Sequence, residues 1–227
     1  MLVGFSTGAL APGDVVAGAA RAALVAPGLV ELSALAEGEL ASVEAVAAVL
    51  AAASSWPRVS VHGPAKGRVV AEGELVARLG ALGLDVVMHP DVLVDVPAWG
   101  VLGSRLLVEN NDDRKSFGGS VADLDAVFAV LGRAGFCLDV SHAYAFGGLG
   151  HVRALAAAYG SRLAQLHVGC AAGRAGMGVV LGPELLAGVA AAVAVAGRRV
   201  PVVLERAGAG ASDVELVAQV RAVVAAC

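Results

Sequence analysis

Residues 106–115 read LLVENNDDRK, and the chain changes character in the middle of this stretch. The apolar run that opens it is typical of a buried β-strand. Glu109 ends that run, and two amides, two carboxylates and two cations follow directly. A solvated loop would account for this polarity, and so would a functional site built at the end of a strand. The rest of the sequence decides between these two interpretations.

Seven other short runs of β-branched and leucine residues recur along the chain, separated by longer alanine-rich segments of helical character. Together with 106–110, the predicted strands are 2–6, 29–33, 58–62, 85–89, 136–140, 163–168 and 200–205. The predicted helices are 13–25, 39–53, 69–82, 121–133, 149–159, 183–196 and 212–225. Side chains that can accept from free N–H groups stand near four helix starts, at Asp14, Ser42, Ser120 and Ser212.

Strands that alternate with helices predict a parallel sheet, and eight such units predict a closed (β/α)8 TIM barrel, an α/β fold. We expect residues 1–227 to form one such domain. An open doubly wound sheet is the alternative, but GFSTGALAPGD at 4–14 lacks that fold's usual GxGxxG loop. Pro97 and Gly100 leave room for only an abbreviated helix between strands four and five.

Composition limits the classes of function. The chain is 58% hydrophobic and 16% charged, which allows a large core. A net charge of -4 without a long basic run argues against nucleic acid as a partner. The three cysteines form no CxxC spacing, the start has no basic region typical of a signal peptide, and the longest apolar run, 185–197, is too short to span a membrane. We therefore expect a cytoplasmic protein, and the sequence leaves open whether it forms a homo-oligomer.

Polar residues collect at the carboxyl ends of six consecutive predicted strands. Strands three to eight end in His62, His89, Glu109, Asp139, His167 and Glu205. His142 follows three residues after Asp139, so four of the five histidines of the chain fall on this rim. Because barrel enzymes build their catalytic face from the carboxyl ends of strands, these side chains are expected to share one cavity.

Three carboxylates around one barrel mouth repel one another, and taking each out of water costs several kcal/mol. A divalent cation resolves this conflict, since Asp, Glu and His are its ligands at about 2.0–2.2 Å. Each residue also has a structural explanation when taken alone. A strand-end histidine can simply be hydrogen-bonded, and Glu205 could pair with Arg206 or Arg198. Taken together, the rim residues predict a metal site.

These strand ends resemble those of the xylose-isomerase-like barrels, which include sugar epimerases and endonuclease IV. The resemblance covers nearly the whole chain and rests on the short motifs VHGP, MHPD, LVENND, CLDVSHA, LHVG and VLE. In the epimerase branch it implies a metal held by Glu109, Asp139, His167 and Glu205. It also implies that substrate oxygens contact His142 and Arg174, the latter in GRAGMG at 173–178.

The resemblance further implies a metal-dependent isomerase or epimerase of a small hydroxy-carbonyl compound such as a sugar. Glu109 and Glu205 would move a proton at carbon through an enediolate, with Mn, Mg, Zn or Fe as the Lewis acid. His62 and His89 are open to two interpretations. They either bind substrate or, as in the endonuclease branch, share Glu109 to hold another metal.

Two other classes of function stay open. A multinuclear site would suit an iron-dependent oxidase or a phosphoesterase similar to endonuclease IV. The latter needs an Asp-x-His after the seventh strand, where this chain has AGMGVVLG at 175–182, so abasic-site cleavage is disfavoured. A barrel without chemistry that binds a partner is the other class. Glu31 is predicted to lie either at the floor of the rim or in a buried network, and Asn110 and Asn111 are expected to support metal ligands.

Overall fold

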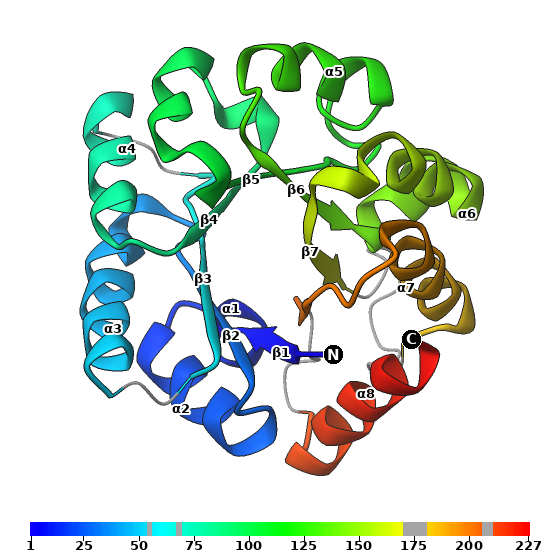
Figure 1. Cartoon of the computed structure of the whole chain (residues 1–227). Coiled ribbons are helices and arrows are strands. Elements are labelled where there is room, and N and C mark those ends of the chain that lie inside the picture. Colours follow the sequence, from blue (N-terminus) through cyan, green and yellow to red (C-terminus); the bar gives the residue numbers. More distant parts are fainter. Residues whose placement is uncertain (54–55, 67–69, 170–180, 206–210) are drawn as a thin grey trace.

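The computed structural model describes residues 1–53, 56–66, 70–169, 181–205 and 211–227. In these residues eight parallel strands close into a barrel in chain order, and the last strand pairs with the first. Figure 1 looks along the barrel, with the strands around the centre and the helices outside them. The predicted (β/α)8 barrel is confirmed.

The strands match the sequence prediction to within about two residues at each end. They are β1 (Val3–Ser6), β2 (Leu29–Ser33), β3 (Arg58–His62), β4 (Asp85–Met88), β5 (Leu106–Glu109), β6 (Gly135–Asp139), β7 (Leu163–Val168) and β8 (Val202–Leu204). His89 and Glu205 therefore follow the last residue of their strands directly.

The long helices form the outer ring. They are α2 (Val15–Val25), α3 (Leu40–Ala53), α4 (Glu72–Ala81), α5 (Val121–Val130), α6 (Val140–Tyr159), α7 (Pro183–Ala196) and α8 (Asp213–Ala226). A short helix, α1 (Thr7–Leu10), was not predicted. In the described residues, no helix is long and apolar enough to cross a membrane.

Three of the four predicted helix caps are confirmed. Asp14 caps α2, and Ser120 and Ser212 form capping boxes at α5 and α8. The predicted cap at Ser42 is wrong, because Ser42 lies inside α3. A 3-10 turn at Glu37–Glu39 already leads into that helix, so the helical backbone begins before the serine.

The connection between β4 and β5 is abbreviated, as predicted. It consists of two 3-10 segments, η2 (Pro90–Val92) and η3 (Val96–Arg105), in place of a full helix. Trp99 anchors η3, since its ring is fully buried and its Nε1 donates to Glu72 Oε1 at 2.6 Å.

Helix α6 begins earlier than predicted, directly after β6. Asp139 caps it by accepting a hydrogen bond from the backbone N–H of His142 at 2.8 Å. The helix is kinked at Gly147 and Gly148, and Gly148 has a φ of 66°. The predicted start at 149 corresponds to the second half of the helix, after this kink.

Alternation along the strands decides which side chains enter the barrel, because successive residues of a strand point to opposite faces. Val108 and Leu138 pack outward into the large core under the helices, whereas Leu107 and Cys137 form a small cluster inside the barrel. Residues two positions away from this inner cluster on the same strand lie on the same face, so they also point inward. At the carboxyl ends of β5 and β6 these are Glu109 and Asp139.

Close approach of β1 to β2 requires glycine at position 4. A Cβ atom there would lie 1.9 Å from the carbonyl oxygen of Leu29, which is backbone and cannot rotate away. We predict that Gly4→Ala lowers the free energy of unfolding by about 1–3 kcal/mol through overpacking. Gly38→Ala is the control, since a Cβ atom at Gly38 meets nothing within 4 Å. Urea unfolding of both variants tests this, and equal stability would contradict it.

Candidate metal centre

Alternation brings the predicted rim residues together at the carboxyl end of the barrel. Glu109 is at their centre and is fully buried. Its carboxylate oxygens lie 3.2 Å from His62 Nε2, 3.8 Å from His89 Nε2, 3.5 Å from His142 Nδ1 and 3.4 Å from His167 Nδ1. Four of the predicted rim histidines therefore lie around Glu109, while the expectation that they share a functional cavity stays a prediction.

One group of four residues has the composition of a divalent-cation site. Glu109, Asp139, His167 and Glu205 each offer one ligand atom, and these atoms lie within 4.8 Å of one another. His167 Nδ1 is 3.1 Å from Glu205 Oε1 and 3.4 Å from Glu109 Oε1. They are the four residues that the resemblance to the epimerases indicated.

Two of these atoms are buried without a hydrogen-bond partner among the described residues. They are Glu109 Oε1 and His167 Nδ1, which face each other. A buried polar atom without a hydrogen bond lowers the stability of the fold by about 1–3 kcal/mol, so such atoms are rare in native proteins. A cation between the two atoms would satisfy both. The residues present therefore fit a divalent metal ion.

A second group could hold a cation beside the first. His62, His89 and Glu109 also offer ligand atoms within 4.8 Å of one another. Glu109 Oε2 faces the two histidines, whereas Oε1 faces His167. The two oxygens of one carboxylate thus point toward two different groups, which is the geometry that a bridging ligand needs.

The site opens toward solvent on one side. His142 and Glu205 have side chains 24% and 23% exposed, whereas His167 is fully buried. The His142 ring lies 5.8 Å from that of His89, between centroids. His89, His142 and Glu205 are therefore the members of the cluster that solvent reaches. Arg174 lies outside the described residues, and its substrate contact stays a prediction.

Supporting hydrogen bonds fix the strand ends. Asn110 donates to the Asp139 carbonyl oxygen at 3.0 Å and accepts from the Asp139 backbone N–H at 2.9 Å, which ties β5 to β6. Asn111, the other expected support, instead donates to Asp91 Oδ1 and the Phe117 carbonyl. Glu31, for which two positions were open, lies in a buried network with Ser60, Gln165 and His167.

The histidines carry much of the positive charge in the cluster. Burial lowers the pKa of His62, but the hydrogen bond and charge of Glu109 outweigh it and raise the pKa to about 9. Burial also lowers the pKa of His142, and the charges of Asp139 and Glu109 raise it to about 9. The pKa of His167 is raised well above its ordinary value in spite of burial, chiefly by Cys137, Glu31 and Glu205.

The pKa values of the three carboxylates shift in different directions. Burial raises the pKa of Glu205, but the charge of His167 outweighs it and lowers the pKa to about 2. Burial dominates at Asp139, where it raises the pKa to about 7, with further increases from the charges of Glu205 and Glu109. The pKa of Glu109 falls well below its usual value, since His89 and His167 outweigh its burial.

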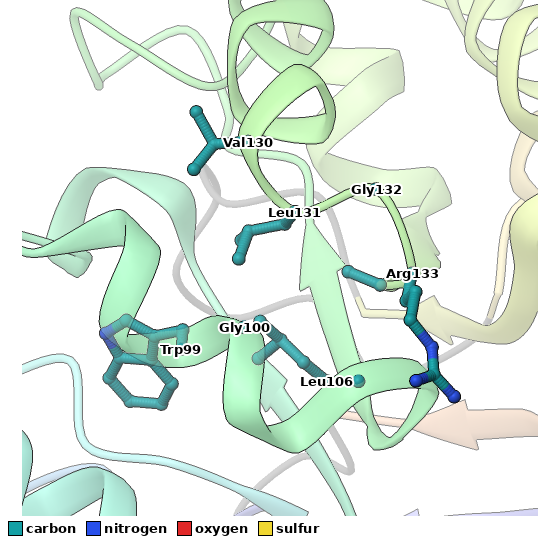
Figure 2. Close-up of a pocket in the computed structure, with 9 residues that line it drawn as sticks. Trp99, Gly100, Leu106, Val130, Leu131, Gly132 and Arg133 are labelled. Atoms are coloured by element: carbon teal, nitrogen blue, oxygen red, sulfur yellow. The ribbon is translucent and has the colours of Figure 1, made fainter.

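A separate cavity lies at the opposite end of the barrel. It has a volume of about 200 Å³ and is lined by the start of β5, the end of η3 and the loop that precedes β6. Figure 2 shows Trp99, Leu131 and Arg133 around it. Because catalytic groups of such barrels gather at the carboxyl ends of the strands, this cavity is not a candidate for the active site.

Comparison with known proteins identifies the fold. No family model and no curated protein matches the chain. A solved IOLI protein with a bound zinc atom matches with a TM-score of 0.69 at 11% identity, covering 100% of this chain and 98% of that chain. The 3-keto-D-glucoside 4-epimerase YcjR from E. coli matches with a TM-score of 0.63 at 12% identity, with 99% of each chain covered.

A D-allulose 3-epimerase from Methylomonas sp., solved with D-allulose, matches with a TM-score of 0.60 at 18% identity, covering 98% of this chain and 89% of that chain. The chain shares its barrel fold with these solved proteins. At these identities the comparisons show the fold alone, so the chemistry has to be argued from the site.

Replacement of one acidic ligand tests the four-residue group. Asp139→Asn keeps an oxygen that can cap α6 but removes a negative ligand. We predict at least a tenfold loss of affinity for Mn²⁺, measured by calorimetric titration, with the thermal unfolding temperature within a few degrees of wild type. Asp123→Asn is the matched control, because Asp123 caps α5 but belongs to none of the ligand groups. Equal losses in both variants would contradict the assignment.

Protons and the cation should compete for the cluster. The pKa of His167 is raised well above its ordinary value in spite of burial, so this ring tends to keep its proton, and a ligand nitrogen must lose its proton to bind metal. Affinity for Mn²⁺ is therefore expected to rise between pH 6 and pH 9, with protons released on binding. Calorimetry in buffers of different ionisation enthalpy measures that release. Binding without proton release at neutral pH would be the opposite result.

Proposed function

We propose that the protein is a divalent-metal-dependent isomerase or epimerase that acts on a small hydroxy-carbonyl compound such as a sugar. The observation that carries this proposal is the pair of carboxylates, Glu109 and Glu205, that approach His167 Nδ1 from strands on either side of β7. The sugar epimerases among the structural neighbours support it through the shared fold. We further propose a cytoplasmic location, with a small molecule as substrate.

Glu109 and Glu205 would carry the proton transfers. A carboxylate must be ionised to act as a base, and both have lowered pKa values. One of the two carboxylates removes a proton from the carbon beside the substrate carbonyl. The other carboxylate returns a proton to the opposite face of that carbon, which gives the epimer. A divalent cation held by Glu109, Asp139, His167 and Glu205 would supply Lewis acidity at the substrate carbonyl. Glu205 is partly exposed, so a substrate can reach it from solvent.

His142 and His89 would orient the substrate. His142 holds a proton at neutral pH, since its pKa is about 9, and it lies on the open side of the site. A charged imidazole donates strong hydrogen bonds to hydroxyl or carbonyl oxygens. His89 has a lowered pKa, mainly because it is buried, so its neutral ring can both donate and accept.

A second candidate function is favoured by one specific observation. Glu109 Oε2 faces His62 and His89, which would complete a second cation site. Two cations sharing a carboxylate would suit an iron-dependent oxidase or a phosphoesterase. Cation stoichiometry separates this candidate from the epimerase.

Hydrogen exchange tests the proposed reaction. In D₂O with Mn²⁺, we expect the protein to exchange the C–H hydrogen beside the carbonyl of a ketohexose, and Glu205→Gln to slow this exchange by about 10²-fold or more. Glu184→Gln is the control, because Glu184 is an exposed glutamate at the start of α7. NMR of the sugar measures deuterium incorporation. Unimpaired exchange in Glu205→Gln would rule out the proposed role of that residue.

The double variant His62→Ala, His89→Ala tests the number of cations. For the epimerase, we expect it to bind as many Mn²⁺ equivalents as wild type. Its apparent substrate affinity should fall, since each lost hydrogen bond to a polar substrate group costs about 1–3 kcal/mol. Equilibrium dialysis with metal analysis gives the stoichiometry. Loss of one full equivalent would instead support the two-cation candidate.

A further inference from the structure

Glu31 is a buried carboxylate that the proposed reaction does not use. It points into the barrel from β2, is fully buried, and lies among groups from β3 and β7. Its Oε2 accepts a hydrogen bond from Ser60 Oγ at 3.1 Å and another from Gln165 Nε2 at 2.7 Å. The same oxygen is 3.1 Å from His167 Nε2. Burial of a carboxyl group is costly, so a glutamate at this position beside a candidate metal ligand requires an explanation.

The two nitrogens of His167 face different partners. Nε2 faces Glu31, whereas Nδ1 faces Glu109 and Glu205. A neutral imidazole carries a hydrogen on one nitrogen and a lone pair on the other, and only the lone pair binds a metal ion. The position of that hydrogen therefore decides whether Nδ1 can be a ligand.

Gln165 and Glu31 favour opposite positions for the hydrogen on the His167 ring. Gln165 Nε2 is 2.9 Å from His167 Nε2, and this amide could donate to an unprotonated Nε2, which would leave the hydrogen on Nδ1. Glu31 is an acceptor and favours the hydrogen on Nε2. Oε2 of Glu31 already accepts from Ser60 Oγ and lies closer to Gln165 Nε2 than His167 Nε2 does, so the geometry favours Glu31 as the acceptor. Gln165 then donates to Glu31, as its 2.7 Å distance indicates.

We propose that Glu31 is a positioning residue that keeps the hydrogen of His167 on Nε2 and so leaves Nδ1 free to bind the cation. This inference rests on the proposed metal site, but not on the epimerase reaction. It assigns a role to a contact that crosses the barrel interior between β2 and β7. It also explains why Nδ1 is buried without a hydrogen-bond partner among the described residues.

Zinc affinity tests the proposal, with Glu31→Gln as the variant and Ser60→Ala as its matched control. Glu31→Gln keeps the shape of the side chain but removes its charge, and we expect a 10–100-fold loss of Zn²⁺ affinity. Ser60→Ala removes another hydrogen bond to the same oxygen without touching His167, and should cost at most about fivefold. Competition with a chromophoric chelator measures both. Equal affinities of Glu31→Gln and wild type would overturn the proposal.

The NMR spectrum of the zinc-loaded wild-type protein shows directly which nitrogen of His167 carries the hydrogen, so this test does not depend on whether a variant folds. We expect an imidazole N–H signal assigned to Nε2 of His167, shifted downfield by its hydrogen bond to Glu31. In Glu31→Gln this signal should move upfield. A hydrogen on Nδ1 of His167 in the wild type would overturn the proposal. Failure of the wild type to bind Zn²⁺ would overturn the metal site itself, and this inference with it.

Discussion

The charge balance around Glu109 is the constraint on which the rest of the site depends. This carboxylate is fully buried in the barrel mouth. Three histidines at strand ends and His142 in the first turn of α6 lie within 3.8 Å of its oxygens. Asp139 and Glu205 bring two more carboxylates to the same place. The carboxylates cannot remain ionised there without positive charge. The raised pKa values of His62, His142 and His167 favour protons on these rings in the metal-free protein, and a divalent cation would supply the positive charge more compactly.

The barrel tolerates this unfavourable cluster because the stability of the fold comes from the apolar layer between the strands and the helices. Aliphatic residues such as Val108 and Leu138 fill the layer between strands and helices, where they pack without polar groups. Glycine at position 4 lets neighbouring strands approach closely. Rim residues contribute little to that core, so their mutual repulsion is tolerated for the sake of binding.

Much of the fold could be predicted from the sequence because it follows from local periodicity, and the strand ends then place the polar residues on one rim. The four residues of the proposed ligand group were singled out by the resemblance to the epimerases. A strand alternates its side chains, so a polar residue at the end of an apolar run, as at Glu109 or His167, has to point into the barrel mouth. The network around Glu31 was harder to predict from the sequence. A glutamate in mid-strand can be exposed or paired, and its partner Gln165 is 134 residues away along the chain. The early start of α6 was missed because Gly147 and Gly148 indicate a break, whereas the helix continues through a kink.

Anomalous X-ray diffraction from crystals grown with Mn²⁺ tests the central claim most directly, because it locates the cation relative to each carboxylate. We predict one strong peak between Glu109 Oε1, Asp139, His167 Nδ1 and Glu205. A crystal without a peak among these four side chains would contradict the claim that the rim is built to hold a divalent cation.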